Sequence, residues 1–311
     1  MYERQRVAVV VPALNESGHI AGVLRRIPDY VDSIIVVDDG STDDTAEQAA
    51  AVGDGRVEVI RHPVRRGVGG ATLSGMRRAL ELQADLIVKV DGDGQMDPSR
   101  IASLLDPLVH QHYDYAKGNR FLDSAALRQM PRHRLFGNFV LTFLTKLASG
   151  YWHVFDPQNG YVAATAKALR ALDLDALARG FFFENDILIN LNVLNLHVKD
   201  VSIPAHYGGE RSSVRVRRIL ITFPFYLMRG FWTRIWRKYV LRDFSPIAVF
   251  WIVGSVFLTW GVVFGGLTWL RSIFSGRAAT TGTVMLSVLP FLLGFELVLQ
   301  AIILEIRETP R

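Results

Sequence analysis

The 311-residue sequence contains no cysteine. Without thiols the chain can form no disulfide bond, bind no metal through cysteine and carry out no thiol chemistry. Intrinsic disorder is not expected either, because 50% of the residues are hydrophobic and a chain of this length can bury a sizeable core. Two further absences are local: one segment has no charged residue, and another has no acidic residue.

The segment without charge, Phe244 to Leu270, is longer than the roughly 20 residues that a helix needs to cross a bilayer. A second apolar stretch, Thr283 to Leu304, contains Glu296 and is interrupted by Pro290. We expect two transmembrane helices within residues 244–306. The alternative is a pair of buried helices in a soluble protein. That alternative does not account for the lack of a polar face on the first helix.

The segment without acidic residues, Arg211 to Arg242, carries nine basic residues interleaved with aromatic and aliphatic ones. This composition is typical of amphipathic helices that lie on anionic lipid headgroups. A nucleic-acid-binding patch has a similar composition. Because the segment lies next to the apolar spans, we expect it to bind membrane lipids, and we expect no nucleic-acid partner. We therefore expect juxtamembrane helices in residues 211–243. Because positive flanks stay on the cytoplasmic side, the N-terminal domain and both termini are expected in the cytoplasm.

Residues 1–210 alternate short β-branched runs with helical patterns, which predicts a parallel, doubly wound α/β sheet covered on both faces. Ligands of such sheets bind beyond the carboxyl ends of the strands. The first two helices are expected to be capped by Ser17 and by Ser41 or Thr42. Strands are expected at Arg6–Leu14, Asp32–Ser41, Arg56–Pro63 and Ala84–Gly94, and helices at Ser17–Val31, Thr42–Gly53 and Gly70–Gln83.

The fourth strand ends in the acidic stretch DGDGQMD. Asp91, Asp93 and Gln95 offer oxygen atoms at alternate positions, which suits Mg²⁺ or Mn²⁺. A calcium loop is disfavoured, because the twelfth residue of the stretch is Ala102 instead of a bidentate glutamate. A solvated turn is the ordinary alternative for such a sequence. Asp97, which precedes a proline, is expected to cap the following helix.

Three other stretches place polar or glycine residues at strand ends. VVVPALNE ends in Asn15 and Glu16, and VVDDGSTDDT contains Asp38 and Asp39. These side chains are suited to a ribose or a base, although helix capping would also explain some of them. The glycine-rich stretch RRGVGGATLSG leads into a helix and permits close backbone approach to a phosphate. It lacks the Gly-Lys-Ser/Thr ending of a Walker loop.

The stretches VVVPALNE, VVDDGSTD, RRGVGGA and DGDGQMDP, in this order, resemble glycosyltransferase family 2. The resemblance covers about Val7 to Ser213 and is closest to the polyprenyl-phosphate glycosyltransferase branch typified by dolichyl-phosphate mannose synthase. It implies a GT-A fold, a mostly parallel Rossmann-like sheet, with membrane spans after the domain. It also implies a metal-dependent hexosyltransferase that inverts the anomeric centre, with homo-oligomers such as tetramers common among similar proteins.

The resemblance implies site residues, which are carried over position by position. The divalent cation, Mg²⁺ or Mn²⁺, would be held by Asp91, Asp93 and Gln95. The nucleotide-sugar donor would be bound by residues at or just beyond the carboxyl ends of the first four strands: Pro12, Asn15, Glu16, Asp38, Asp39, Arg66, Gly67 and Asp91.

The acceptor implied by the resemblance is a polyprenyl phosphate. Its phosphate would be bound by Arg120 of KGNRF, by Arg134 and Asn138 four residues apart, and by Arg211. The stretch FDPQNGY, which contains Asp156, resembles an element bordering the sugar site. Asp93, Arg120, Arg134 and Asp156 are the residues expected to carry the reaction. A phosphate with its second pKa near 6 is already ionised at neutral pH and needs no strong general base.

Three other readings remain open. Glu184 and Asp186 lie roughly where branches that attack with a hydroxyl keep an acidic base, although a helix N-terminus also favours acids. If either acts as a base, the protein is a polysaccharide or glycolipid synthase. A processive synthase would usually carry more spans and a Gln-x-x-Arg-Trp element. A non-catalytic membrane scaffold would be expected to have lost the Asp-x-Asp pair or the glycine turn, and neither is lost.

Overall fold

The computed structural model covers the chain and describes residues 1–120, 132–203 and 216–310, without the side chains of residues 132–138 and 216–221. The chain forms two compact units. The first comprises Met1–Phe231 and the second Trp232–Thr309. Each unit is described separately below.

The first unit is built on a seven-stranded sheet with the strand order β3-β2-β1-β4-β6-β5-β7. All neighbouring strands pair in parallel except β6, which is antiparallel to both β4 and β5. The strands are β1 (Val7–Ala13), β2 (Ser33–Asp38), β3 (Val57–Arg61), β4 (Leu86–Lys89), β5 (Tyr115–Asn119), β6 (Val162–Thr165) and β7 (Val198–Ser202). The expected α/β sheet is therefore confirmed, with one reversed strand that the sequence did not predict.

The central strands are buried on both faces, as their continuous apolar runs predict. Every residue of β1 is buried. Because successive side chains point to opposite faces of a sheet, Ala8 and Val10 enter one hydrophobic cluster while Val9 and Val11 enter the other.

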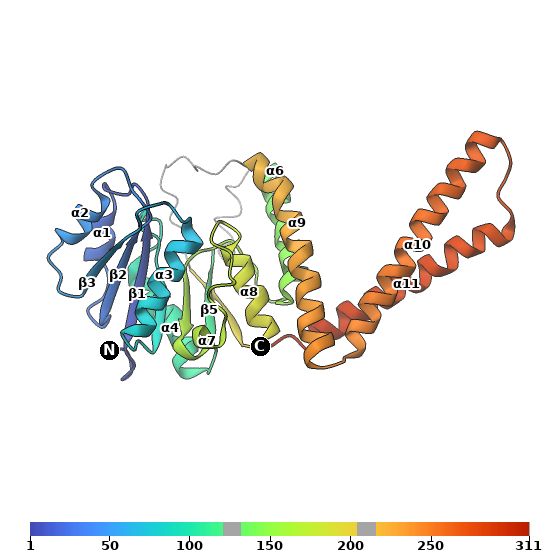
Figure 1. Cartoon of the computed structure of the whole chain (residues 1–311). Coiled ribbons are helices and arrows are strands. Elements are labelled where there is room, and N and C mark those ends of the chain that lie inside the picture. Colours follow the sequence, from blue (N-terminus) through green and yellow to red (C-terminus); the bar gives the residue numbers. More distant parts are fainter. Residues whose placement is uncertain (121–131, 204–215, 311) are drawn as a thin grey trace. The chain divides into compact units, whose positions relative to one another are not determined.

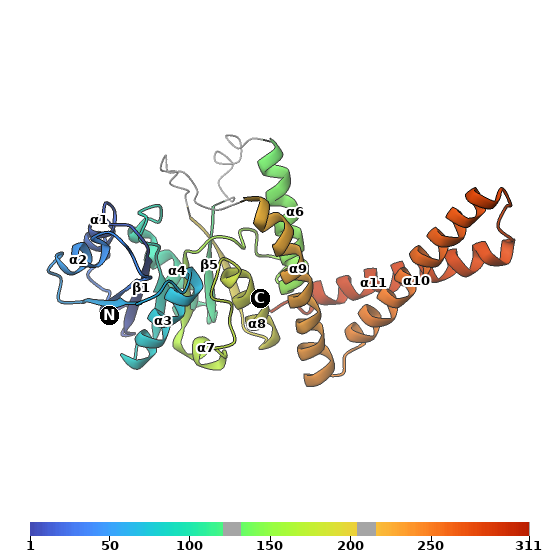
Figure 2. The ribbon, with the colours of Figure 1, turned by 45° about the horizontal axis from the view of Figure 1, so that its top comes forward.

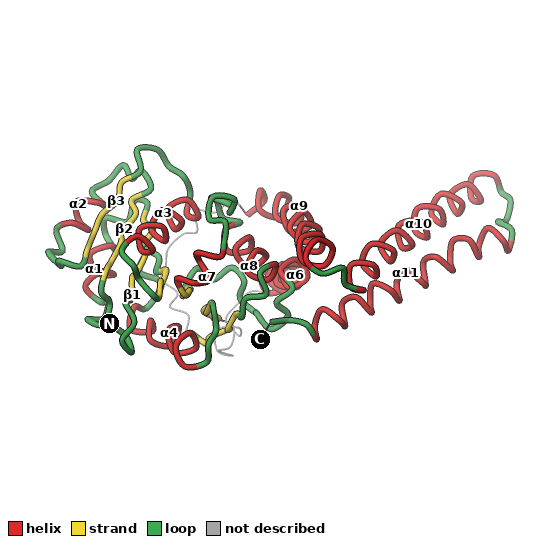
Figure 3. Tube along the Cα trace, turned by 60° about the horizontal axis from the view of Figure 1, so that its bottom comes forward, coloured by secondary structure: helices red, strands yellow, loops and turns green. Residues whose placement is uncertain are grey.

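Helices cover both faces of the sheet. Figures 1 and 3 show α1 (Ile20–Arg25) and α2 (Thr45–Ala50) on one side of β1–β3 and α3 (Val68–Glu81) on the other. α4 (Ile101–His110), which follows the short 3-10 helix η1 (Pro98–Arg100), shares the cluster of α1, whereas α7 (Ala166–Ala171) and α8 (Phe183–Val193) share that of α3. The remaining long helices of this unit are α6 (Arg132–Ser149) and α9 (Val216–Arg234).

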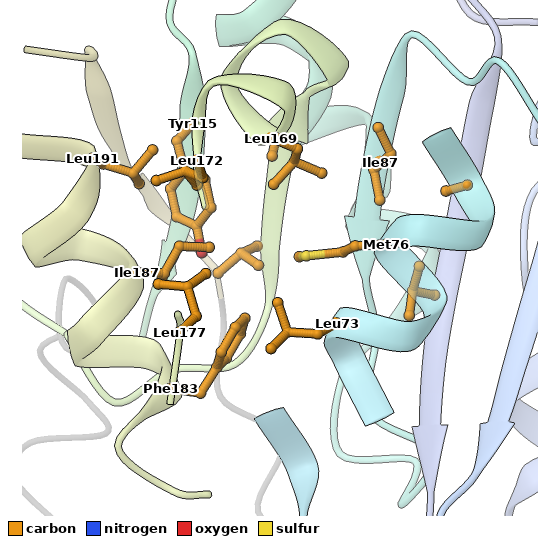
Figure 4. Close-up of a cluster of buried hydrophobic side chains, with 14 of the residues drawn as sticks. Leu73, Met76, Ile87, Tyr115, Leu169, Leu172, Leu177, Phe183, Ile187 and Leu191 are labelled. Carbon is orange, nitrogen blue, oxygen red and sulfur yellow. The ribbon is translucent and has the colours of Figure 1, made fainter. Parts of the chain in front are cut away.

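A layer of apolar side chains joins α3 to α8. Leu73 and Met76 of α3 point toward Phe183 and Ile187 of α8, with Tyr115 behind them (Figure 4). All five side chains are at most 2% exposed. This packing fixes the N-terminus of α8 relative to the sheet.

The first unit also includes α9 up to Phe231, which lies beside α8 (Figure 2). Gly230 of α9 approaches the Ile189 side chain so closely that a Cβ atom there would lie 2.5 Å from the Ile189 Cδ1 atom. Phe182 makes ring contacts with Phe223 and Tyr226 of α9. These contacts attach α9 to the sheet domain.

Two expected helix caps are wrong and one is confirmed. α1 begins at Ile20 with His19 at its N-cap and has no side-chain cap, and the backbone N–H of Ser17 is donated to Asp43 in another loop. α2 is preceded by Asp44 and not by Ser41 or Thr42. Asp97 does cap η1, since its carboxylate accepts a hydrogen bond from the backbone N–H of Ser99.

The second unit contains the two long apolar helices. α10 (Pro246–Ser275) and α11 (Thr281–Arg307) are long and apolar enough to span a membrane. They form a hairpin in which Gly254 and Gly294 bring the backbones together, because a Cβ atom on Gly294 would lie 2.8 Å from the Gly254 carbonyl oxygen. Most of their large apolar side chains are exposed, which suits contact with lipid better than a soluble core.

A π-helix, η2 (Ile235–Arg242), leads into α10. Arg234, at the end of α9, is fully buried and pairs with Glu305 of α11, with 2.8 Å between Nη1 and Oε1. Lys238 is also buried, at 6% exposure. Among the described side chains of the segment Arg211 to Arg242, the basic residues Arg234 and Lys238 are therefore buried and do not face lipid headgroups.

Candidate active site

The reversed strand β6 brings distant segments to one edge of the sheet. Val162 at the start of β6 pairs with Lys89 at the end of β4 and with Lys117 in the middle of β5. The loop of residues 155–161 therefore lies between the loop that follows β4 and the one that follows β5. The carboxyl ends of β1 and β2 belong to the same edge, because both strands run parallel to β4.

The loops after β1 and β2 are tied together by side chains. Asn15 adopts a left-handed conformation, with φ of 57°. Its backbone N–H is donated to the Ser41 hydroxyl oxygen over 2.9 Å, and its Oδ1 accepts from the Thr42 backbone N–H over 2.9 Å. The Glu16 carboxylate lies 3.3 Å from the His19 ring. Asn15 thus shapes the edge, and its expected contact with the donor stays a prediction.

Asp39 organises the turn that precedes α3. Its carboxylate is 3% exposed and accepts hydrogen bonds from the backbone N–H groups of Arg66 (2.8 Å) and Gly67 (2.7 Å). His62 adds a third contact, with Nδ1 2.8 Å from Asp39 Oδ1. Asp38 accepts from the Ser41 backbone N–H over 2.9 Å. Both acids are thereby engaged in holding the loops that would surround a nucleotide.

The glycines of the turn permit close packing against the segment before α8. Gly67 has φ of 87°, and a Cβ atom there would lie 2.7 Å from the Arg179 carbonyl oxygen. Gly69 could carry no side chain either, because its Cβ atom would lie 2.6 Å from the Ala178 carbonyl oxygen. The Gly70 backbone N–H is donated to the same Arg179 oxygen over 2.9 Å. These glycines therefore also serve the fold, besides their expected approach to phosphate.

The acidic loop after β4 is compact. The Gln95 backbone N–H is donated to Asp93 Oδ1 over 3.0 Å, and Gly94 has φ of 76°. The Gly92 backbone N–H is donated to the Pro12 carbonyl oxygen over 3.2 Å, which joins this loop to the end of β1. Asp91 and Asp93 are partly exposed and Gln95 is exposed.

The chemistry of these side chains fits a divalent cation, since carboxylate and amide oxygens are ligands of Mg²⁺ and Mn²⁺. In the part of the chain that the structure describes, no three His, Asp or Glu side chains form a preassembled metal cluster. A cation at Asp91, Asp93 and Gln95 would therefore need further oxygen atoms from water or from a bound diphosphate.

Lys89, which the sequence analysis did not single out, lies beneath this loop. Its side chain is 1% exposed, and its Nζ atom lies 2.7 Å from Asp91 Oδ1 and 3.6 Å from Glu184 Oε1. Burial lowers the pKa of Lys89, but the carboxylates of Asp91 and Glu184 outweigh it and hold that pKa above its usual value. The signal in the sequence was a lysine inside an apolar strand.

Lys117 is the second buried lysine at this edge. Its side chain is fully buried and donates a hydrogen bond to the Asn159 carbonyl oxygen. Burial lowers the pKa of Lys117 to about 8, although nearby acids oppose the shift.

The candidate acceptor side is formed by Arg120 and Asp156. The Asp156 carboxylate, 1% exposed, lies 2.8 Å from Arg120 Nε through Oδ2 and 3.1 Å from Arg120 Nη2 through Oδ1. The Arg120 side chain itself is 35% exposed. Arg134 and Asn138 belong to α6, but their side chains lie outside the described residues, as does all of Arg211.

Asp200 of β7 supports the same loop. Its Oδ2 atom accepts hydrogen bonds from the Asn119 side chain and, over 3.3 Å, from the Phe155 backbone N–H. Burial raises the pKa of Asp200 to about 6, against the lowering effect of these two donors. Asp200 therefore links β7, β5 and the loop that carries Asp156.

The two acids considered as a base have different surroundings. Asp186 Oδ2 accepts from the Ala178 backbone N–H over 2.7 Å, which is a local structural role. Glu184 is 9% exposed and faces Lys89. Asn185 between them accepts hydrogen bonds from Thr145 and Gln158 and joins α6 to the loop of residues 155–161.

A comparison with protein families identifies the domain. The family described as glycosyl transferase family 2 matches residues 8–173. The chain belongs to glycosyl transferase family 2. Residues 8–173 include every donor-side residue named above, the reversed strand and the Arg120–Asp156 pair.

Two relatives fit the family 2 branch suggested by the motifs. The UDP-N-acetylglucosamine–dolichyl-phosphate N-acetylglucosaminyltransferase of Methanococcus voltae is 32% identical and is matched over 70% of this chain and 92% of its own length. The undecaprenyl-phosphate mannosyltransferase of Micrococcus luteus is 30% identical, over 64% of this chain and 82% of its own. Both transfer a sugar to a polyprenyl phosphate, as their names state.

A solved structure of a glycosyltransferase that acts on a small acceptor shares the fold. Glucosyl-3-phosphoglycerate synthase of Mycobacterium tuberculosis, in complex with Mn²⁺, UDP and phosphoglyceric acid, superposes with a TM-score of 0.57 at 25% identity. The match covers 74% of this chain and 78% of that one. The expected GT-A-like sheet is therefore confirmed for this family 2 glycosyltransferase.

Proposed function

We propose that this protein transfers a single sugar, with inversion, from a nucleotide-sugar donor to a polyprenyl phosphate at the cytoplasmic face of a membrane. The observation that carries the proposal is the placement of the Asp91–Asp93 loop and of Arg120 on either side of the loop of residues 155–161, whose Asp156 pairs with Arg120. A chain with two long apolar helices after such a domain is suited to a lipid-linked acceptor. The relatives described above act on acceptors of this kind.

The donor would lie along the ends of β1, β2 and β4. Asn15, Glu16 and Asp38 would face the nucleoside, while Asp39 would hold the Arg66–Gly67 turn against the diphosphate. Pro12 positions the acidic loop through its carbonyl oxygen. Mg²⁺ or Mn²⁺ bound by Asp93 and Gln95, with Asp91 beside them, would neutralise charge on the diphosphate as it leaves.

The acceptor phosphate would be bound by arginines. Asp156 holds the Arg120 guanidinium through two oxygens, so the arginine is already oriented before an anion binds. Arg134 and Asn138 of α6, with Arg211, are the other proposed contacts. These groups would place one phosphate oxygen in line with the anomeric carbon, a contribution of proximity that needs no strong base.

The alternative, a hydroxyl acceptor, requires a carboxylate that can remove a proton. Asp186 is hydrogen-bonded to the Ala178 backbone, and Glu184 lies beside the buried ammonium group of Lys89. Neither placement favours a general base over a structural role. The phosphate acceptor therefore agrees better with the surroundings of both acids.

The membrane arrangement follows from charge. The exposed side chains of residues 211–243, among them Phe225, Met228 and Trp236, would lie on anionic headgroups, whereas Arg234 and Lys238 are buried. The glycosyltransferase domain and both termini would then lie in the cytoplasm. We also propose a homo-oligomer, such as a tetramer, because similar proteins of the polyprenyl-phosphate glycosyltransferase branch form one.

A direct test uses the purified full-length protein with Mn²⁺, polyprenyl phosphate and a panel of radiolabelled UDP- and GDP-sugars. The proposal expects one donor to give label in the organic phase. Label that enters only a water-soluble carbohydrate would support the hydroxyl-acceptor alternative instead. The same panel identifies the base and the sugar of the donor.

A further inference from the structure

Lys89 joins three segments beneath the proposed donor site. It ends β4, its ammonium group pairs with Asp91 Oδ1 at 2.7 Å, and it donates a hydrogen bond to the Gly160 carbonyl oxygen over 3.2 Å. Glu184, at the start of α8, lies 3.6 Å away. The lysine therefore contacts the acidic loop, the loop before β6 and α8 at once.

The space around this ion pair is closed. A Cβ atom on Gly160 would lie 2.4 Å from Lys89 Nζ and 3.0 Å from Asp91 Oδ2. The Lys89 side chain is 1% exposed, whereas that of Asp91 is 27% exposed. One side of the Asp91 carboxylate is thus held inside the protein by a charge, and the residue still reaches the solvent edge.

Lys117 provides an internal comparison. Both lysines are fully buried in strands of the sheet, Lys89 at the end of β4 and Lys117 in the middle of β5, and both donate to carbonyl oxygens of the same loop, those of Gly160 and Asn159. Lys89 forms an ion pair with Asp91, and the ion pairs of the described residues include none between Lys117 and Asp91. A variant of Lys117 therefore measures what a buried lysine contributes to folding, and a variant of Lys89 measures in addition any effect on Asp91.

We propose that Lys89 is a positioning residue of the donor site, which fixes the Asp91 carboxylate through Oδ1 and so presents Oδ2 to the nucleotide in one orientation. This inference rests on the proposed function, because it takes Asp91 to face the donor. Replacing a group that holds a ligand-binding side chain in place commonly weakens ligand affinity about 10- to 100-fold. Lys89 acts through Asp91 and does not itself touch the donor.

The test measures binding of UDP and of GDP, each with Mn²⁺, to the full-length protein in detergent by calorimetry, with thermal unfolding of each variant alongside. Lys89→Met is expected to weaken binding of the preferred nucleotide by about tenfold or more. Lys117→Met is expected to lower the unfolding temperature as well but to change the affinity by less than about twofold. Equal affinity losses in the two variants would overturn the inference.

A double-mutant cycle tests whether Lys89 acts through Asp91. In an Asp91→Asn background, Lys89→Met is expected to change the affinity by less than about twofold, because the carboxylate that it holds is gone. An undiminished effect in that background would overturn the inference and leave the proposed function standing. A wild-type protein that binds neither nucleotide would overturn the proposed function, and this inference with it.

A second pair of variants covers the case in which Lys89→Met does not fold. Gly160→Ala places a methyl group against the Lys89–Asp91 pair and is expected to weaken nucleotide binding by about tenfold. Gly180→Ala is the matched control, because its Cβ atom would meet nothing within 4 Å. Wild-type affinity in a folded Gly160→Ala variant would contradict the proposal.

Discussion

Asp156 holds Arg120 by two oxygens at once, with 2.8 Å from Oδ2 to Nε and 3.1 Å from Oδ1 to Nη2. The acid is buried and the arginine partly exposed, so the guanidinium is held in one orientation at the edge of the sheet while Asp156 balances its charge. Under the proposed function, the exposed side of this guanidinium would meet the acceptor phosphate.

Replacing Arg120 by Met should therefore affect the acceptor more than the donor. We expect kcat/KM for polyprenyl phosphate to fall about 10- to 100-fold, the value of one or two charge-assisted hydrogen bonds. The KM for the nucleotide sugar should change little. Arg77, which pairs with Asp175, is the matched control, and Arg77→Met should leave both constants near wild type. A loss confined to donor affinity would contradict the assignment.

Asp39 should act on the nucleotide pocket through the turn that it holds. Asp39→Ala leaves the Arg66 and Gly67 N–H groups and the His62 ring without their acceptor and should cost about 2–4 kcal/mol of unfolding free energy. Nucleotide affinity, measured by calorimetry, should fall with it. Asp54→Ala removes an ion pair with Arg56 before β3 and should spare nucleotide affinity. Unchanged nucleotide affinity in Asp39→Ala would contradict a role of Asp39 in the nucleotide pocket.

The sheet was largely predictable, because runs such as VAVVV and SIIVV are apolar on both faces and their helices separate them regularly. The reversed strand β6 was not, since its direction depends on pairing with Lys89, more than 70 positions earlier in the chain. The cap expected at Ser17 is wrong because the helix begins only at Ile20, and Ser17 belongs to the preceding loop, where its backbone N–H is donated to Asp43.

Within the candidate site, the sequence predicted which residues belong to the site but not which hydrogen bonds and ion pairs they form. The acidic loop and Arg120 stand out in the sequence as motif residues. The engagement of Asp39 by the Arg66–Gly67 turn, and of Asp91 by Lys89, depends on how loops meet at the sheet edge. The lysine inside the apolar run LIVKV was the signal in the sequence for the ion pair between Lys89 and Asp91.

Asp200 should make the stability of the protein depend on pH. Its pKa is raised from 3.8 to about 6 by burial, so its favourable contribution is complete below pH 3.8 and is lost as the pH rises through about 6. The unfolding free energy of the wild type, relative to that of Asp200→Asn, should fall across this window and then stay level. Denaturant unfolding at several pH values measures it, and a flat difference from pH 4 to 6 would count against the raised pKa.

The hairpin of α10 and α11 should depend on Gly294. A valine there would force apart two backbones, because even its Cβ atom would lie 2.5 Å from the Leu258 nitrogen. We expect Gly294→Val to lose about 1–3 kcal/mol of stability in detergent. Gly282→Val is the control on the same helix, because a Cβ atom at Gly282 meets nothing within 4 Å. Equal stability of the two variants would contradict the packing.

The central claim, that the acceptor is a lipid phosphate, is tested most directly by comparing two acceptors of identical chain length. Polyprenyl phosphate and the corresponding polyprenol, each incubated with the wild-type protein, Mn²⁺ and the preferred labelled donor, differ only in the anion that Arg120 would bind. The account predicts labelled lipid from the phosphate alone, and its loss in Asp93→Ala with folding retained. Equal labelling of the alcohol, or full activity of Asp93→Ala, would contradict it.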